Sequence, residues 1–261
     1  MKNKRSYIYA GIIAIVMLMF VVFGTNFKKT KENENIKDTF SELGSSITND
    51  KTFKDSKYPL LAEIKDKDFH IYGVNKNDDN YRGVIVKYGK STKEYDITYM
   101  TPMFILPKLK AMEFNKKEII FSSFNVASGS EIYLEDLYGF YLNSNGNLEK
   151  IYFSPQDYKS QLDKAIKYNL KNNGMLNVTI GGGNNFNINL KDLADPNWKL
   201  NKITYGNNVS FIFDDGIKIK LGLEAFFENI VTPQYIGTVE AKVTLNKDNL
   251  FILKDIAITE N

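Results

Sequence analysis

The residues best suited to chemistry gather around one short loop of serine and glycine, residues 128–130. Three carboxylic acids lie close behind this loop: Glu131, Glu135 and Asp136. Two carboxyl groups that stand about 5–9 Å apart across a cleft can hydrolyse a glycosidic bond. Charged residues where a loop enters a strand more often face water. The loop also lacks the G-x-S-x-G pattern of a serine hydrolase. Hydrolysis of glycans by paired carboxylates is therefore the alternative hypothesis.

Tyrosines flank the same loop. Tyr141 and Tyr152 belong to the hairpin that follows it, in a chain with 16 tyrosines and 18 phenylalanines. Exposed tyrosine rings can stack on sugars or anchor a peptide partner, whereas cross-strand pairs of tyrosines only stabilise a sheet. We expect binding instead of catalysis. The predicted ligand-binding residues are Ser128, Gly129, Ser130, Tyr133 and Tyr138.

Composition excludes several other kinds of site. The chain has no cysteine, so it has no disulfides, no thiolate zinc site and no cysteine nucleophile. Its single histidine, His70, excludes histidine-rich metal sites, and its alternating surroundings predict a partly exposed position on a strand. The net charge is +3, from 34 basic and 31 acidic residues, and does not favour a nucleic-acid partner. We expect no cofactor and no metal.

Short alternating segments predict a mainly β fold from Pro59 onward. Three of them are separated by turn-forming stretches and indicate an antiparallel meander: Phe69–Val74, Arg82–Tyr88 and Glu94–Tyr99. The region of the serine–glycine loop continues the pattern. It predicts a strand, a tight turn, a strand, the loop, a strand, a hairpin at Asn145-Gly146 and a strand at Leu148–Phe153.

Part of this region resembles a known type of repeat. The segments that carry the resemblance are Thr98–Pro102, Ile105–Pro107, Lys116–Ile119 and Ser128–Ser130, with residues 161–168 and 233–237 fitting later. They resemble FG-GAP/VCBS-type propeller repeats and, more closely, membrane-anchored extracytoplasmic domains of clostridia and related Firmicutes. The resemblance implies a propeller-like part and no particular activity. Calcium takes about six to eight oxygen ligands, which the turn at residues 113–117 (EFNKK) lacks, so no metal is predicted there.

One amphipathic helix is predicted at Ser154–Leu170. Ser154 is a favourable N-cap, and Pro155 occupies the first helical position. The apolar residues share one helical face, and Gly174 follows as a C-terminal signal. Alternating strands predict a sandwich-like arrangement for the remainder of the chain: 176–180, 186–190, 209–213, 217–227, 236–245 and 250–258.

An uncharged apolar run, Tyr7–Phe23, precedes all of this. Its 17 residues would span roughly 26 Å as a helix, slightly less than a hydrocarbon core. Lys2, Lys4 and Arg5 before it favour a cytoplasmic N-terminus. We expect a retained anchor; a signal peptide cleaved near residues 22–24 is the alternative. The predicted anchor residues are Tyr7, Ile12, Ile15, Leu18, Phe20 and Phe23.

The predicted organisation has five segments. Residues 1–24 form the stub and anchor, 25–58 a flexible stalk, 59–153 an N-terminal β part, 154–174 a connecting helix and 175–261 a C-terminal β part. The composition is typical of a Gram-positive, AT-rich bacterium. We therefore predict a single-pass membrane protein with an extracellular domain that binds a cell-wall glycan or an envelope protein, or that acts as an accessory protein.

Overall fold

The structure is a computed structural model that describes residues 58–74, 80–100, 105–130, 132–171, 174–181, 183–190, 199–228 and 230–259. All of them belong to one compact unit, residues 51–261. The predicted stub, anchor and almost all of the stalk lie outside the described residues. No helix in the described part is long and apolar enough to cross a membrane.

The fold is mainly β, as predicted, with three sheets and one α-helix among the described residues. The first sheet is an antiparallel meander in the order β1-β2-β3-β4, which confirms the predicted meander. Its strands are β1 (Leu60–Ile64), β2 (Phe69–Gly73), β3 (Asn80–Tyr88) and β4 (Ser91–Met100), with a short 3-10 turn η1 (Lys65–Lys67) between the first two.

The second sheet has eight strands in the order β15-β14-β13-β12-β7-β6-β5, and β8 also pairs with β7. Its strands are β5 (Lys108–Phe114), β6 (Lys117–Gly129), β7 (Ile132–Leu142), β8 (Leu148–Phe153), β12 (Leu200–Ile212), β13 (Ile217–Phe227), β14 (Gln234–Leu245) and β15 (Phe251–Thr259). Strands from both predicted β parts meet in this sheet, because β12 runs parallel to β7 at residues 208–209 and 133–134.

The helix α4 (Pro155–Ala165) starts as predicted. The Ser154 hydroxyl and the Asp157 carboxylate form a capping box, with proline in the first turn. The prediction that the helix continues to Leu170 is wrong. Residues Ile166–Leu170 are β9, which pairs with β10 (Met175–Ile180) and, through it, with β11 (Asn184–Asn189) in the third sheet. Gly174, at φ +78°, belongs to the β9–β10 hairpin turn instead of a helix end.

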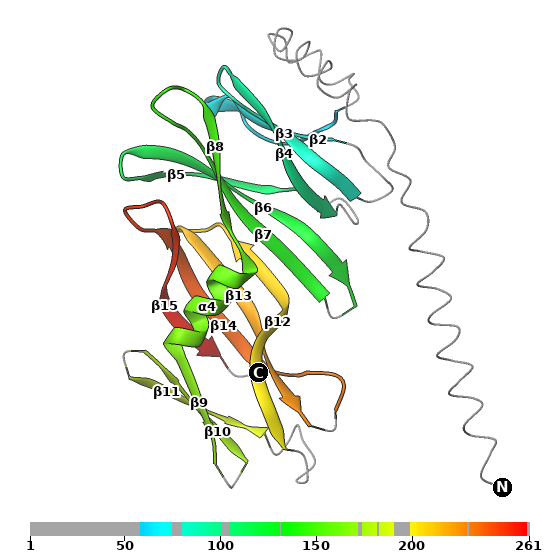
Figure 1. Cartoon of the computed structure of the whole chain (residues 1–261), viewed down its shortest axis with the longest axis vertical. Helices are drawn as coiled ribbons and strands as arrows, with labels where there is room; N and C mark the ends of the chain where they lie inside the picture. Colours follow the sequence, from blue (N-terminus) through cyan, green and yellow to red (C-terminus); the bar gives the residue numbers. More distant parts are fainter. Residues whose placement is uncertain are drawn as a thin grey trace, which may run out of the picture. The chain divides into compact units, whose positions relative to one another are not determined.

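Strands β6 and β7 form a wall between two hydrophobic cores (Figure 1). Neighbouring residues of β6 point to opposite sides, as the period of a strand requires. Ile119 and Phe121 enter the core shared with α4 and β12–β15, whereas Ile120 and Phe124 enter the core under the first sheet. All four are buried almost completely.

The single histidine does not lie where the sequence indicated. His70 is 4% exposed, and every residue of β2 is buried. The prediction of a partly exposed position is wrong because β2 lies between β1 and β3 and both of its faces are covered. Its imidazole lies 3.7 Å from Glu63 and 3.6 Å from Asp68, measured between nitrogen and carboxylate oxygen.

Candidate functional site

The predicted serine–glycine loop is the tip of the β6–β7 hairpin. Ser128 and Gly129 end β6, and Ser130 begins the turn. Gly129 and Ser130 are exposed, and Ser128 pairs across the hairpin with Tyr133. Glu131 lies outside the described residues. The tip is thus accessible, but the pockets described below are not lined by it.

Tyr138 lies farther along β7 and is buried. It pairs across the strands with Tyr152 of β8, and the two rings stack at 4.6 Å with an interplanar angle of 13°. Lys150 lies over the Tyr138 ring at 5.1 Å. The structure therefore brings Tyr138 into cross-strand packing, away from the hairpin tip that carries Ser128–Ser130.

Tyr133 lies next to a buried acid. Its hydroxyl donates to Glu135 at 2.6 Å, and the Glu135 side chain is 1% exposed. The same carboxylate accepts hydrogen bonds from the Lys108 ammonium at 2.8 Å and from the Phe211 amide at 2.7 Å. Glu135 thereby connects β5, β7 and β12, and its oxygens are already engaged.

Asp136 is the second predicted acid. Tyr152 and Tyr138 donate hydroxyl hydrogen bonds to its carboxylate at 3.0 Å and 3.5 Å. Burial raises the pKa of Asp136 above its usual value, and the two hydrogen bonds partly oppose that rise because they favour the charged form. No group of three or more acidic or histidine side chains in the described part of the chain could hold a metal ion.

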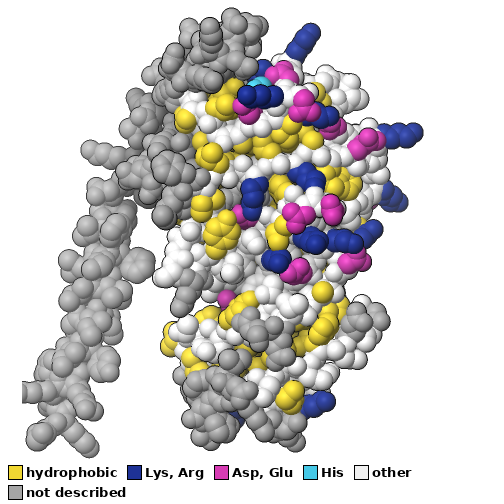
Figure 2. Space-filling model, turned by 180° about the vertical axis from the view of Figure 1, so that it is seen from behind, with side chains coloured by type: hydrophobic (Ala, Val, Ile, Leu, Met, Phe, Trp, Pro, Cys, Tyr) yellow, Lys and Arg dark blue, Asp and Glu magenta, His cyan; other side chains and the backbone are white. Residues whose placement is uncertain are grey.

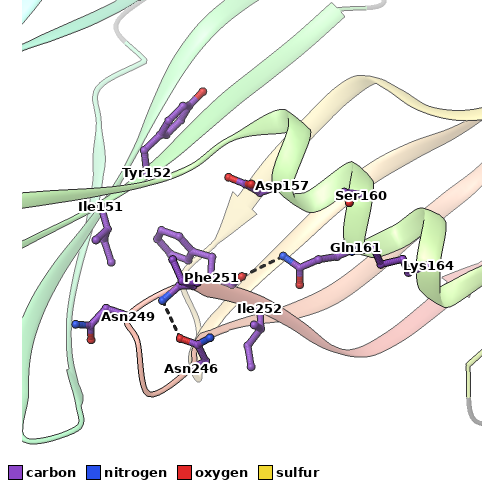
Figure 3. A pocket seen from close by; sticks show the side chains of 11 residues that line it. Ile151, Tyr152, Asp157, Ser160, Gln161, Lys164, Asn246, Asn249, Phe251 and Ile252 are labelled. Atoms are coloured by element: carbon purple, nitrogen blue, oxygen red, sulfur yellow. Dashed lines mark hydrogen bonds between the residues drawn. The ribbon is translucent and has the colours of Figure 1, made fainter.

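A groove of about 470 Å³ lies between α4, the end of β8 and the β14–β15 hairpin. Figure 3 shows its two polar walls, one on the helix and one on the hairpin. Its lining residues are Ile151, Tyr152, Asp157, Ser160, Gln161, Lys164, Asn246, Asn249, Leu250, Phe251 and Ile252. The ring of Tyr152 lies at the margin and points away from Asn246 (Figure 3).

Gln161 joins the two sides of the groove. Its side-chain amide donates to the Phe251 carbonyl at 3.0 Å and accepts from the Leu253 amide at 2.8 Å. Because β15 is the last strand of its sheet, this amide takes the place of a further strand at that edge. The contact holds α4 against β15 and fixes the width of the groove.

Other polar side chains of the groove are not engaged in this way. Ser160, Lys164 and Asn249 make no side-chain hydrogen bond or ion pair with any residue that the structure describes. Between them, apolar side chains form the floor, and Leu250 on the hairpin is 62% exposed. The groove thus offers unused donors and acceptors beside apolar surface, which is the usual make-up of a ligand site.

Sequence reasoning missed these groove residues. Positions 157, 160, 161 and 164 have the i, i+3, i+4, i+7 spacing of one helical face, so a polar stripe was visible in the sequence. That this stripe faces residues 246–252 depends on tertiary packing, which no local pattern indicates.

No protein-family model, no curated protein and no solved structure matches the chain. The resemblance to FG-GAP/VCBS-type repeats and to clostridial extracytoplasmic domains stays a prediction.

Proposed function

We propose that the protein is a membrane-anchored extracytoplasmic binding protein that holds a cell-envelope glycan in the groove beside α4, without catalysis. The observation that carries this proposal is the pair of polar walls on either side of an apolar floor. Ser160 and Lys164 extend from the helix, and Asn249 from the hairpin, with none of the three engaged among described residues.

A glycan fits this chemistry. Sugars present hydroxyl groups at their edges and C–H groups on their faces, so they need donors and acceptors beside apolar contact. Most polar groups of the groove are neutral, and Lys164 and Asp157 place one charge of each sign on the helix wall. An envelope protein is the alternative ligand if no oligosaccharide binds.

Location is a separate part of the proposal. The apolar run Tyr7–Phe23 and the polar stretch after it support an anchor and a stalk. On the face seen in Figure 2, basic and acidic side chains are intermixed, which supports a proposal without a nucleic-acid partner. The anchor, and the subdivision into a propeller-like and a sandwich-like part, stay predictions.

Glycan hydrolysis remains the second candidate because of one observation. Burial raises the pKa of Asp136, as expected of a general acid. The neighbouring Glu135 is held by Lys108 and by a backbone amide, which weakens its case as the second catalytic group. If Asp136 were the acid, Asp136→Asn would abolish release of reducing ends from a soluble cell-wall glycan; if the protein only binds, none is released by either form.

The binding test uses the full chain in detergent micelles and calorimetric titration with soluble cell-wall oligosaccharides. Each lost hydrogen bond is worth about 1 kcal/mol, so the double variant Ser160→Ala/Asn249→Gly should bind at least tenfold more weakly. Glycine suits position 249, where φ is +60°. Ser130→Ala, at the hairpin tip, is the matched control and should leave the affinity unchanged.

Two results would overturn the groove as the site. One is unchanged affinity in the double variant; the other is a loss of affinity in Ser130→Ala, which would return the site to the hairpin tip. If the folded protein binds none of the oligosaccharides, the proposal that its ligand is a glycan is wrong.

A further inference from the structure

A second pocket, of about 300 Å³, lies on another side of the same helix. It shares no lining residue with the groove. The pocket is walled by Tyr158 and Lys159 of α4 and by residues of β6, β7, β12 and β13 in the second sheet. None of these residues lines the proposed glycan groove, and the one direct link is the hydrogen bond from Tyr152, at the groove margin, to Asp136.

Glu224 of β13 is the unusual member of this lining. It is 8% exposed, and its carboxylate forms no ion pair with any residue that the structure describes. The Asn207 amide donates to Oε1 at 3.1 Å, and Oε2 has no partner among those residues. A buried carboxylate is costly unless a cation or further hydrogen bonds compensate it. Glu224 therefore offers an unused acceptor to whatever fills the pocket.

The backbone is shaped around this carboxylate. Tyr205 pairs with Leu223 and Val209 with Leu221, so three residues of β12 bulge opposite the single residue Gly222. A β-bulge changes the direction in which nearby side chains point, and bulges are common next to functional sites. A Cβ on Gly206 would come within 2.4 Å of the Glu224 carboxylate, so only glycine allows the carboxylate to lie there.

A second bulge contributes to the same lining. The β6–β7 register shifts between Asn125 and Ala127, which leaves Val126 as the extra residue, and Val126 lines the pocket. Two separate irregularities in one sheet thus open onto the same space.

The other residues that line the pocket favour a positively charged ligand. Glu135 and Asp136 add two carboxyl groups, of which only Glu135 is paired with a cation, Lys108. Tyr158 and Tyr205 supply aromatic surface, which attracts cations, and the Phe226 ring already has the Lys202 ammonium 4.8 Å from its centre. Lys159 is the one basic side chain of the lining in the described chain, and it forms no ion pair there.

We propose that this pocket is a binding site for an organic ammonium group, with Glu224 as its anchoring carboxylate. The ammonium would donate to Glu224 Oε2, and its apolar body would lie against the tyrosine and phenylalanine rings. The proposal goes beyond glycan binding and does not depend on it, because the two sites share no residue.

The test uses a matched pair of small probes, cyclohexylamine and cyclohexanol, which have the same ring and differ in charge. Binding to the full chain in detergent micelles is followed by ligand-observed NMR at neutral pH. We expect cyclohexylammonium to bind at least tenfold more tightly than cyclohexanol. Glu224→Gln, which keeps the size of the side chain, should remove this preference, whereas Glu228→Gln should keep it. Glu228 is a matched control, since it lies just beyond the same strand and is half exposed.

Lys159→Ala provides a second, opposite test. Removal of this competing ammonium should raise the affinity for cyclohexylammonium several-fold. Equal binding of the two probes, an unchanged preference in Glu224→Gln, or weaker amine binding in Lys159→Ala would each overturn the proposal. The last result would mean that Lys159 itself shapes the pocket. Because the probes are not sugars, failure here leaves the glycan proposal standing, and the groove variant Ser160→Ala/Asn249→Gly should bind both probes normally.

Discussion

Replacing Lys108 by methionine should destabilise the protein by about 2–3 kcal/mol, because it removes the cation that compensates a buried carboxylate. The Glu135 side chain is 1% exposed, so its carboxylate cannot regain water when Lys108 is gone. Breaking a buried pair by removing one partner costs about 3–5 kcal/mol. We take a lower value because the Lys108 side chain is 43% exposed and its charge is partly hydrated. The Phe211 amide and the Tyr133 hydroxyl also continue to donate to Glu135.

Glu135→Gln should cost less, about 1–2 kcal/mol. A glutamine oxygen can still accept from the Phe211 amide, and the released Lys108 ammonium can turn into solvent. In the double variant no buried charge is left uncompensated. The two single costs should therefore exceed the cost of the double variant by about 1–2 kcal/mol, as expected for residues in direct contact.

The assay is urea unfolding followed by far-UV circular dichroism, with the free energy taken from the midpoint and slope of each transition. Lys242→Met is the matched control. Lys242 forms an ion pair of similar length with Asp255, 2.7 Å, but both side chains are exposed, so no measurable loss is expected. If Lys108→Met is no more destabilising than Lys242→Met, or if the two single costs simply add, Lys108 does not compensate the Glu135 charge.

Three further predictions concern other parts of the fold. The Lys67 ammonium holds the pKa of Glu118 below its usual value near 4.5. This contact therefore stabilises the protein above about pH 4.5, and its contribution is lost as the pH falls. Lys67→Ala should flatten the acid side of a profile of melting temperature against pH, and an unchanged profile would contradict this. Gly139→Ala should lower the free energy of unfolding in urea by about 1–3 kcal/mol, because the added Cβ would lie 2.8 Å from Ile151. An unchanged free energy would mean that Ile151 of β8 can move aside without cost. Ser154→Ala should cost about 1 kcal/mol through loss of the helix cap, with Ser154→Asp restoring most of it in the same assay.

Strands and turns that are determined by local residue patterns could be predicted from the sequence. Leu148–Phe153 was predicted with the bounds that β8 has, and the turn between β5 and β6 was placed correctly. That turn uses Asn115 and Lys116 at φ +50° and +63°, the backbone form that two-residue hairpins require. Local chemistry decides such features, so the sequence alone is sufficient for them.

Features decided by distant partners could not be predicted. Ile166 continues the helical stripe of α4, yet it pairs with Ile180 in β9 and β10. Either conformation buries Ile166, and only the presence of β10 decides between them. The groove is a similar case, since Gln161 meets Phe251 and Leu253 from some 90 residues away. The serine–glycine turn is recognisable from its composition, but the two pockets beside α4 are not.

The wall formed by β6 and β7 has a consequence for how the protein unfolds. Because Ile119 and Ile120 are neighbours that pack into different cores, departure of β6 from its sheet would open both cores, and we expect this to be the dominant opening event. Amide hydrogens of β2 and of β13 should therefore exchange with solvent through the same global opening event, at similar free energies. A substitution in one core would then weaken exchange protection throughout both, and heat or denaturant would melt the described domain in a single cooperative step.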